Sequence, residues 1–90
     1  MIKNVTQAGS KHWGIHDIKR DTYNPSLLQI DADDSYAEFS SANRAVDILS
    51  NGFKIRSADS DHNTSGDTYI YLAFAEAPFV NSKGVPCNAR

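Results

Sequence analysis

Apolar and polar residues alternate along much of the chain, which is typical of short β-strands. The clearest case is 53–56, where Phe53 and Ile55 would face a core while Lys54 and Arg56 would face water. Asn51-Gly52 leads into this strand, and Gly52 could end a preceding helix by adopting a left-handed conformation. Weaker alternation predicts further strands at 1–6, 12–18 and 26–30, separated by turns at 7–10 and 19–25.

The segment 68–76 is the strongest predicted strand. Tyr69 and Tyr71 lie on one of its faces, and Ile70, Leu72 and Phe74 lie on the other. Apolar groups on both faces predict a central strand that is covered on both sides. Because the polar loop 57–67 connects it to 53–56, the two strands are expected to pair antiparallel.

The segment 36–49 fits two interpretations. Ser35 and Glu38 have the spacing of a helix-capping box, and apolar residues follow at helical intervals. Against the helix, Ser40-Ser41 and the β-branched Val46 and Ile48 are only modest helix formers. The fold class expected overall is mainly β, as an antiparallel sandwich or jelly-roll-like domain over 1–79 with a polar C-terminal tail over 80–90. The alternative is an α+β domain with one helix near 36–49.

Composition narrows the function classes. The chain has 90 residues, a net charge of -2 and one cysteine, Cys87, so it has neither the basic excess expected for nucleic-acid binding nor an internal disulfide. The longest nearly apolar run, 69–75, is far shorter than the ~20 residues of a membrane span, so membrane insertion is not expected. A chain this short buries only about 60–65% of its unfolded surface, which favours stabilisation by association. We therefore expect a partial sandwich that oligomerisation completes.

Candidate chemistry is sparse. Asp59, Asp61 and Asn63 resemble the start of a calcium loop, but Gly66 comes too late for one and a solvated loop fits better. On an extended strand His12 and His16 would lie ~13 Å apart, too far to share one metal ion. The sequence contains no nucleophile, phosphate-loop or zinc motif. We expect no enzyme activity, no metal and no cofactor.

Aromatic residues make up 10% of the chain and offer the better candidates for binding. Aromatic rings on a sheet surface serve as interface anchors or as platforms for sugars. Tyr69 and Tyr71 are the leading candidates because they face away from the apolar side of their strand. Asp59, Asp61 and His62 of the neighbouring polar loop are further candidates for contact with a receptor or a sugar.

Three strings of the sequence carry a resemblance to a known group. They are WGIHD at 13–17, followed by Arg20 and Asn24-Pro25; DILSNGFKIR at 47–56; and NTSGDTYIYLAFAEAPF at 63–79. In this order they resemble structural proteins of bacteriophages and marine viruses. The last string is the most specific.

Members of that group are similar to tail-fibre or virion-surface domains with a concanavalin-like β-sandwich, and this chain resembles the C-terminal part of such a domain. The resemblance implies a structural or host-attachment role in the virion, at the tail or the capsid surface. The expected partners are other copies of the chain and other virion proteins. A lectin-like module that binds a host surface glycan is the alternative. The resemblance also implies a loop with a short strand over 35–46, against the helix, and it transfers no binding residue.

Overall fold

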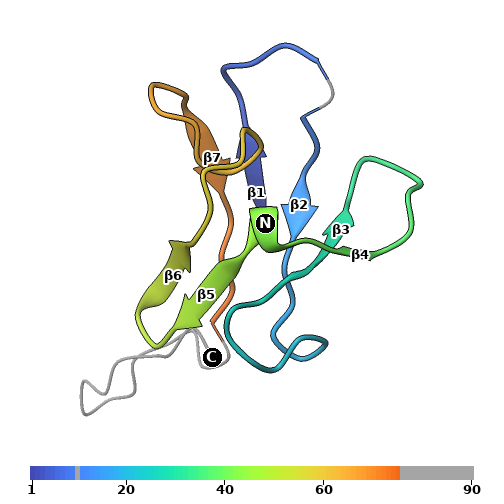
Figure 1. The fold of residues 1–90 in the computed structure, drawn as a ribbon, viewed down its shortest axis with the longest axis vertical. Helices are drawn as coiled ribbons and strands as arrows, with labels where there is room; N and C mark the ends of the chain where they lie inside the picture. The colour runs from blue at the N-terminus through green and yellow to red at the C-terminus, as the bar shows by residue number, and fades with distance from the viewer. Residues whose placement is uncertain (10, 76–90) are drawn as a thin grey trace.

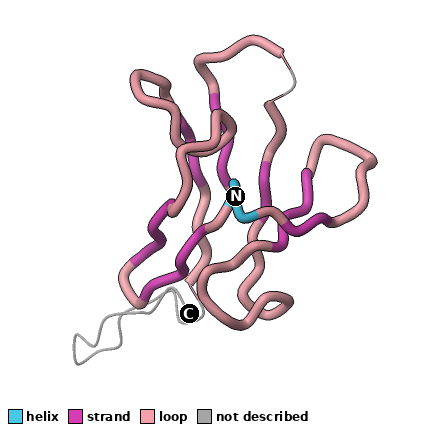
Figure 2. The backbone as a smooth tube through the Cα atoms, viewed as in Figure 1, coloured by secondary structure: helices cyan, strands magenta, loops and turns pink. Residues whose placement is uncertain are grey.

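The fold is mainly β and antiparallel (Figure 1), as the sequence predicts. A computed structural model describes residues 1–9 and 11–75, so the predicted tail 80–90 and Cys87 lie outside the described residues. Most of the described chain is loop, and the strands are short (Figure 2). The elements in chain order are β1 (Ile2–Asn4), β2 (Gly14–Ile15), β3 (Leu28–Asp31), β4 (Phe39–Ser40), the 3-10 helix η1 (Ala42–Arg44), β5 (Val46–Leu49), β6 (Gly52–Ile55) and β7 (Tyr69–Tyr71).

Five strands form the larger sheet, in the order β4-β3-β2-β1-β7. The first and last described strands are therefore neighbours, with Lys3 opposite Ile70. Backbone hydrogen bonds extend this pairing at both ends, because Met1 and Leu72 exchange two bonds of 2.9 Å and the Val5 N–H donates to the Thr68 carbonyl. The N-terminal strand thus fixes the position of β7.

Strands β5 and β6 form a separate two-stranded hairpin. Its turn is Ser50–Asn51, and the next residue has a φ of +150°, a conformation that glycine at position 52 adopts without strain. On its other edge β5 bonds to the segment before β3, where Ser26 and Val46 exchange backbone bonds of 2.8 and 3.0 Å. This bridge ties the hairpin to the larger sheet.

The helix considered for 36–49 is wrong. The structure has β4, one short 3-10 turn and β5 there, as the viral resemblance implies for this region. The helical pattern fails because its members do not share a buried face: Tyr36 is largely exposed, whereas Val46 is buried. The β-branched Val46 and Ile48 instead pair across the hairpin with Ile55 and Phe53.

The prediction for 68–76 is also wrong in its details. Within the described residues, β7 covers three residues and ends the sheet rather than lying in its centre. Nor does β6 pair with it, because β6 pairs with the strand that its own tight turn brings back. Phe53 and Tyr71 meet only through their side chains, as an edge-to-face ring pair with centroids 5.1 Å apart.

The strand predicted at 12–18 is reduced to Gly14–Ile15. Position 14 lies against the side chain of Gln29, which is buried on the neighbouring strand β3. A Cβ atom at this position would lie 2.9 Å from the Gln29 Cδ atom, closer than real Cβ contacts allow. Any larger residue at position 14 would therefore force the buried Gln29 amide to shift.

Few apolar side chains are fully buried. In the described part of the chain these are Ile2, Ala45 and Val46. More polar than apolar residues are buried, namely Asn4, Ser26, Gln29, Asp31 and His62. Buried polar groups are stable only when they are hydrogen-bonded, so specific polar contacts contribute an unusually large share of the stability of this fold.

Candidate functional site

A cavity of about 310 Å³ opens between the hairpin and the larger sheet. Its volume lies at the lower end of the range of small-molecule sites. Both sheets and the segment after β7 contribute apolar side chains to its walls, including Ile2, Ile15, Ile48, Phe53, Leu72 and Phe74. We call this cavity the intersheet groove. In a closed sandwich such a space would be filled by side chains from both layers.

Polar groups occupy one part of the groove wall. The lining includes His16, Asp17 and Met1, the last of which carries the N-terminal ammonium group. Burial lowers the pKa of this ammonium group, which donates to the Leu72 carbonyl. The pKa of His16 is lowered to about 4, chiefly by burial and then by the nearby His62 and ammonium group. At neutral pH the His16 ring is therefore uncharged.

A second, polar cluster lies where the loop 57–67 packs on the larger sheet, and Asn4 is at its centre. The Asn4 Nδ2 group donates to the Ser60 carbonyl at 2.9 Å, to Asp67 Oδ2 at 2.7 Å and to the Tyr69 hydroxyl at 3.2 Å. Its Oδ1 atom accepts from the backbone N–H groups of residues 6 and 7. One buried side chain thus joins β1 to β7 and to residues 60 and 67 of the loop.

Asp61 connects the same loop to two cations. Its carboxylate accepts from Lys11 Nζ at 2.8 Å and from the Arg44 guanidinium on η1. Burial raises the pKa of Asp61, but the bond from Lys11 and the charge of Arg44 outweigh it, so the pKa lies below its ordinary value. Arg44 also pairs with Asp59 at 3.8 Å.

These ion pairs bear on the resemblance to a calcium loop. Asp59 and Asp61, the two carboxylates that a calcium ion would need, already form ion pairs with Arg44 and Lys11. The Asn63 side-chain amide donates to the Ser57 carbonyl. Across residues 1–9 and 11–75, no group of three or more His, Cys, Asp or Glu side chains is arranged to hold a metal ion. A structural loop is the interpretation that fits the geometry.

His16 and His62 come together although 46 positions separate them in the chain. Their rings meet edge to face with centroids 5.6 Å apart. His62 is only 2% exposed and has a lowered pKa, because of burial first and then the charge of Arg44. His12 lies elsewhere, beside Asp33 and Asp34. The strand geometry separates His12 from His16, but nothing in the sequence pattern indicates the pairing with His62.

The five candidate binding residues differ in availability. Tyr71 is 64% exposed, whereas the Tyr69 hydroxyl is engaged by Asn4, the Thr64 N–H and the Ser60 carbonyl. Asp59 and Asp61 are held by cations, as described above, and His62 is buried. Of the five, Tyr71 is the one that presents most of its side chain to solvent. A binding role for the five remains a prediction.

The described chain also lacks any helix that is long and apolar enough to cross a membrane. A search of curated proteins and a search of solved structures find no match to this chain. A family model described as "Domain of unknown function (DUF7483)" matches residues 1–78. The match covers most of the chain and includes both sheets of the fold. The chain therefore belongs to the DUF7483 family.

Proposed function

We propose that this chain is a structural domain of a bacteriophage virion, at the surface of the tail or capsid, which acts as an oligomer in host attachment. The observation that carries the proposal is the open intersheet groove and the apolar segment beside it. In this segment Ile70, Leu72 and Phe74 are exposed, although they are residues of the kind that a sandwich buries. The proposal gives the domain no catalytic role.

The energetics favour a covered groove. Burying one large aliphatic or aromatic side chain contributes about 1.5–3 kcal/mol. The three exposed side chains at 70, 72 and 74 could thus contribute on the order of 5 kcal/mol per copy once they are covered. That is comparable to the whole stability of a small domain, and among residues 1–9 and 11–75 the buried apolar core is three residues. Association with other copies, or with other virion proteins, supplies this cover.

The resemblance of the strings at 13–25, 47–56 and 63–79 to phage structural proteins supports the biological setting. These strings fall on functional parts of the fold. The first contributes Ile15 and His16 to the groove, the second forms the hairpin, and the third contains β7 with Leu72 and Phe74. The residues that carry the resemblance therefore include those that line the groove.

Light scattering of the purified chain tests the proposal. The wild-type chain is expected to be an oligomer, and Phe74→Ser should shift it to monomers by removing an exposed apolar side chain from the groove rim. Tyr23→Ser is the matched control, because Tyr23 is 83% exposed, against 81% for Phe74, but does not line the groove. A folded wild-type monomer at high concentration would contradict the proposal, as would equal effects of the two variants.

The position of the gene tests the virion assignment separately. We expect genes for tail or other virion proteins beside it, and the chain itself in purified virions by mass spectrometry. An operon of metabolic genes would contradict the assignment even if the chain oligomerises.

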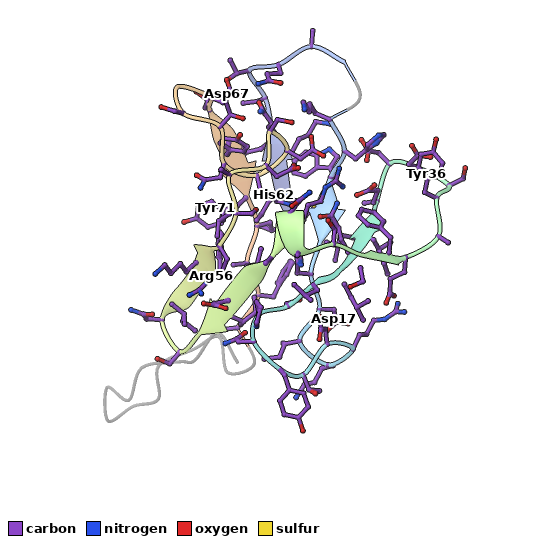
Figure 3. All side chains as sticks on the ribbon, viewed as in Figure 1. Asp17, Tyr36, Arg56, His62, Asp67 and Tyr71 are labelled. Carbon is purple, nitrogen blue, oxygen red and sulfur yellow. The ribbon has the colours of Figure 1, made fainter. Side chains whose placement is uncertain are left out.

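A lectin-like role is the second candidate, favoured by the exposed aromatic rings next to the groove. Tyr71 projects from the sheet edge (Figure 3), and its ring is already oriented by contact with Phe53. A preoriented aromatic ring suits stacking on the apolar face of a sugar. On an array of bacterial surface glycans, this role predicts a signal that Tyr71→Ala lowers at least tenfold and that Tyr23→Ala preserves. A blank array would count against it.

A further inference from the structure

The His16–His62 pair is an unusual feature of the polar core. His16 comes from the segment after β2, and His62 comes from the loop 57–67, which packs on the sheet beside it. His16 Nδ1 lies 3.5 Å from the Ser26 hydroxyl. His16 Nε2 and His62 Nδ1 are buried, and neither has a hydrogen-bond partner among the described residues. The pair therefore joins the loop to the sheet by ring contact rather than by a satisfied polar network.

Charged groups of both signs surround the pair. Asp21 faces His16 from the β2–β3 connection, and Asp31, Asp59 and Asp61 act on His62 from β3 and from its own loop. The Arg44 guanidinium opposes positive charge on both rings, and His62 and the N-terminal ammonium group oppose it on His16. Arg44 and Lys11 already engage Asp59 or Asp61 in ion pairs. A proton on either ring is therefore opposed first by burial and then by nearby positive charge, while the aspartates offset part of this cost.

We propose that the His16–His62 pair is an acid-sensitive latch, which holds the loop 57–67 on the larger sheet while both rings are neutral and loosens when either ring binds a proton. The inference rests on this geometry and does not depend on the proposed virion role.

The direction of the pH dependence follows from His16. Its pKa is about 4 in the folded chain, below the ordinary value of 6.5 that applies when the chain is unfolded. Between these values the unfolded chain binds more protons than the folded one, so acid favours unfolding. The contribution of the neutral pair is complete above about pH 6.5 and is lost as the pH falls toward 4. For His16 alone, the unfolding equilibrium constant should rise about twentyfold from about pH 7 to about pH 5.

The first test uses the wild-type chain. Urea unfolding, followed by the fluorescence of the single tryptophan, should show this rise before the carboxylates titrate. Hydrogen exchange should show the loss of protection first in the loop 57–67, where the amides of His62 and Asn63 bond to the Asp59 carbonyl. Amides of the β5–β6 hairpin serve as the internal reference. Loop protection that stays constant over this range, after correction for intrinsic exchange, would overturn the proposal.

The second test replaces each ring by a side chain that does not titrate. His16→Gln and His62→Gln should each flatten the pH dependence, whereas His12→Gln should leave it in place, because His12 lies outside the pair. An unchanged slope in both of the first two variants would overturn the latch. If neither variant folds, the pH dependence of hydrogen exchange in the wild-type loop 57–67 still tests the latch.

Discussion

Replacement of Asn4 by alanine is expected to lower the free energy of unfolding by about 3 kcal/mol. Asn4 is only 2% exposed, and its side chain makes five hydrogen bonds. A buried group that loses its bond costs about 1–3 kcal/mol, but the partners of Asn4 are only partly buried, so entering water recovers much of the sum. The loss would be a large fraction of the total stability of a domain with so small an apolar core.

Urea denaturation measures this loss. Asn43→Ala is the matched control, because Asn43 is exposed on the 3-10 helix and its removal should change the stability by less than about 0.5 kcal/mol. Leucine at position 4, which has a similar volume, should be no better than alanine, since the Ser60 carbonyl and Asp67 would still lose their donor. A stable Asn4→Leu variant would show that apolar packing, rather than hydrogen bonding, is what this position contributes.

Asp61→Asn is expected to cost about 2 kcal/mol, since it removes the negative charge between Lys11 and Arg44. The two cations would then face each other and His62 without their shared partner. Asp47→Asn is the control. Asp47 pairs with Arg56 at 3.1 Å on the outer side of the hairpin, where Arg56 is half-exposed. Exposed pairs contribute about 0–1 kcal/mol.

The pH dependence separates a charge effect from a packing effect at position 61. The lowered pKa of Asp61 means that its stabilisation is present above its ordinary value of 3.8 and is lost as the pH falls below that value. The difference between wild type and Asp61→Asn should therefore narrow in acid, as measured by urea unfolding across that range. A difference that stays constant in acid would assign the effect to packing instead.

Local patterns determined much of the secondary structure. The alternation at 53–56, after Asn51-Gly52, predicts a strand, which the structure has at Gly52–Ile55 as the second strand of the hairpin. Both signals are local, since a strand that is half covered needs a period of two and a tight turn needs a residue that tolerates positive φ. The mainly β fold class follows from several such segments. The same local reasoning failed at 36–49, because a short apolar run fits both periods and only the pairing partner decides between them.

Long-range contacts decided the rest. Strand β7 pairs with β1, which comes from the opposite end of the described chain. The sequence had suggested β6 as the partner of β7, but β6 pairs with β5. In the part of the chain that the structure describes, the hairpin forms a second layer of only two strands, which leaves the groove open, and no residue pattern predicts how many strands a layer has. Long-range contacts also decide the polar core. In the sequence, Asn4, Asp61 and His62 look like ordinary solvated residues.

The sequence by itself therefore determined that this chain folds mainly into β-strands, and its length of 90 residues predicted a thin core. Only the tertiary structure decided which apolar side chains stay exposed and which polar side chains are buried. The physical reason is that periodicity reports how a residue faces its own strand, whereas burial depends on what the rest of the chain brings against it. For His16 and His62, that partner lies 46 residues away, beyond the reach of any local pattern.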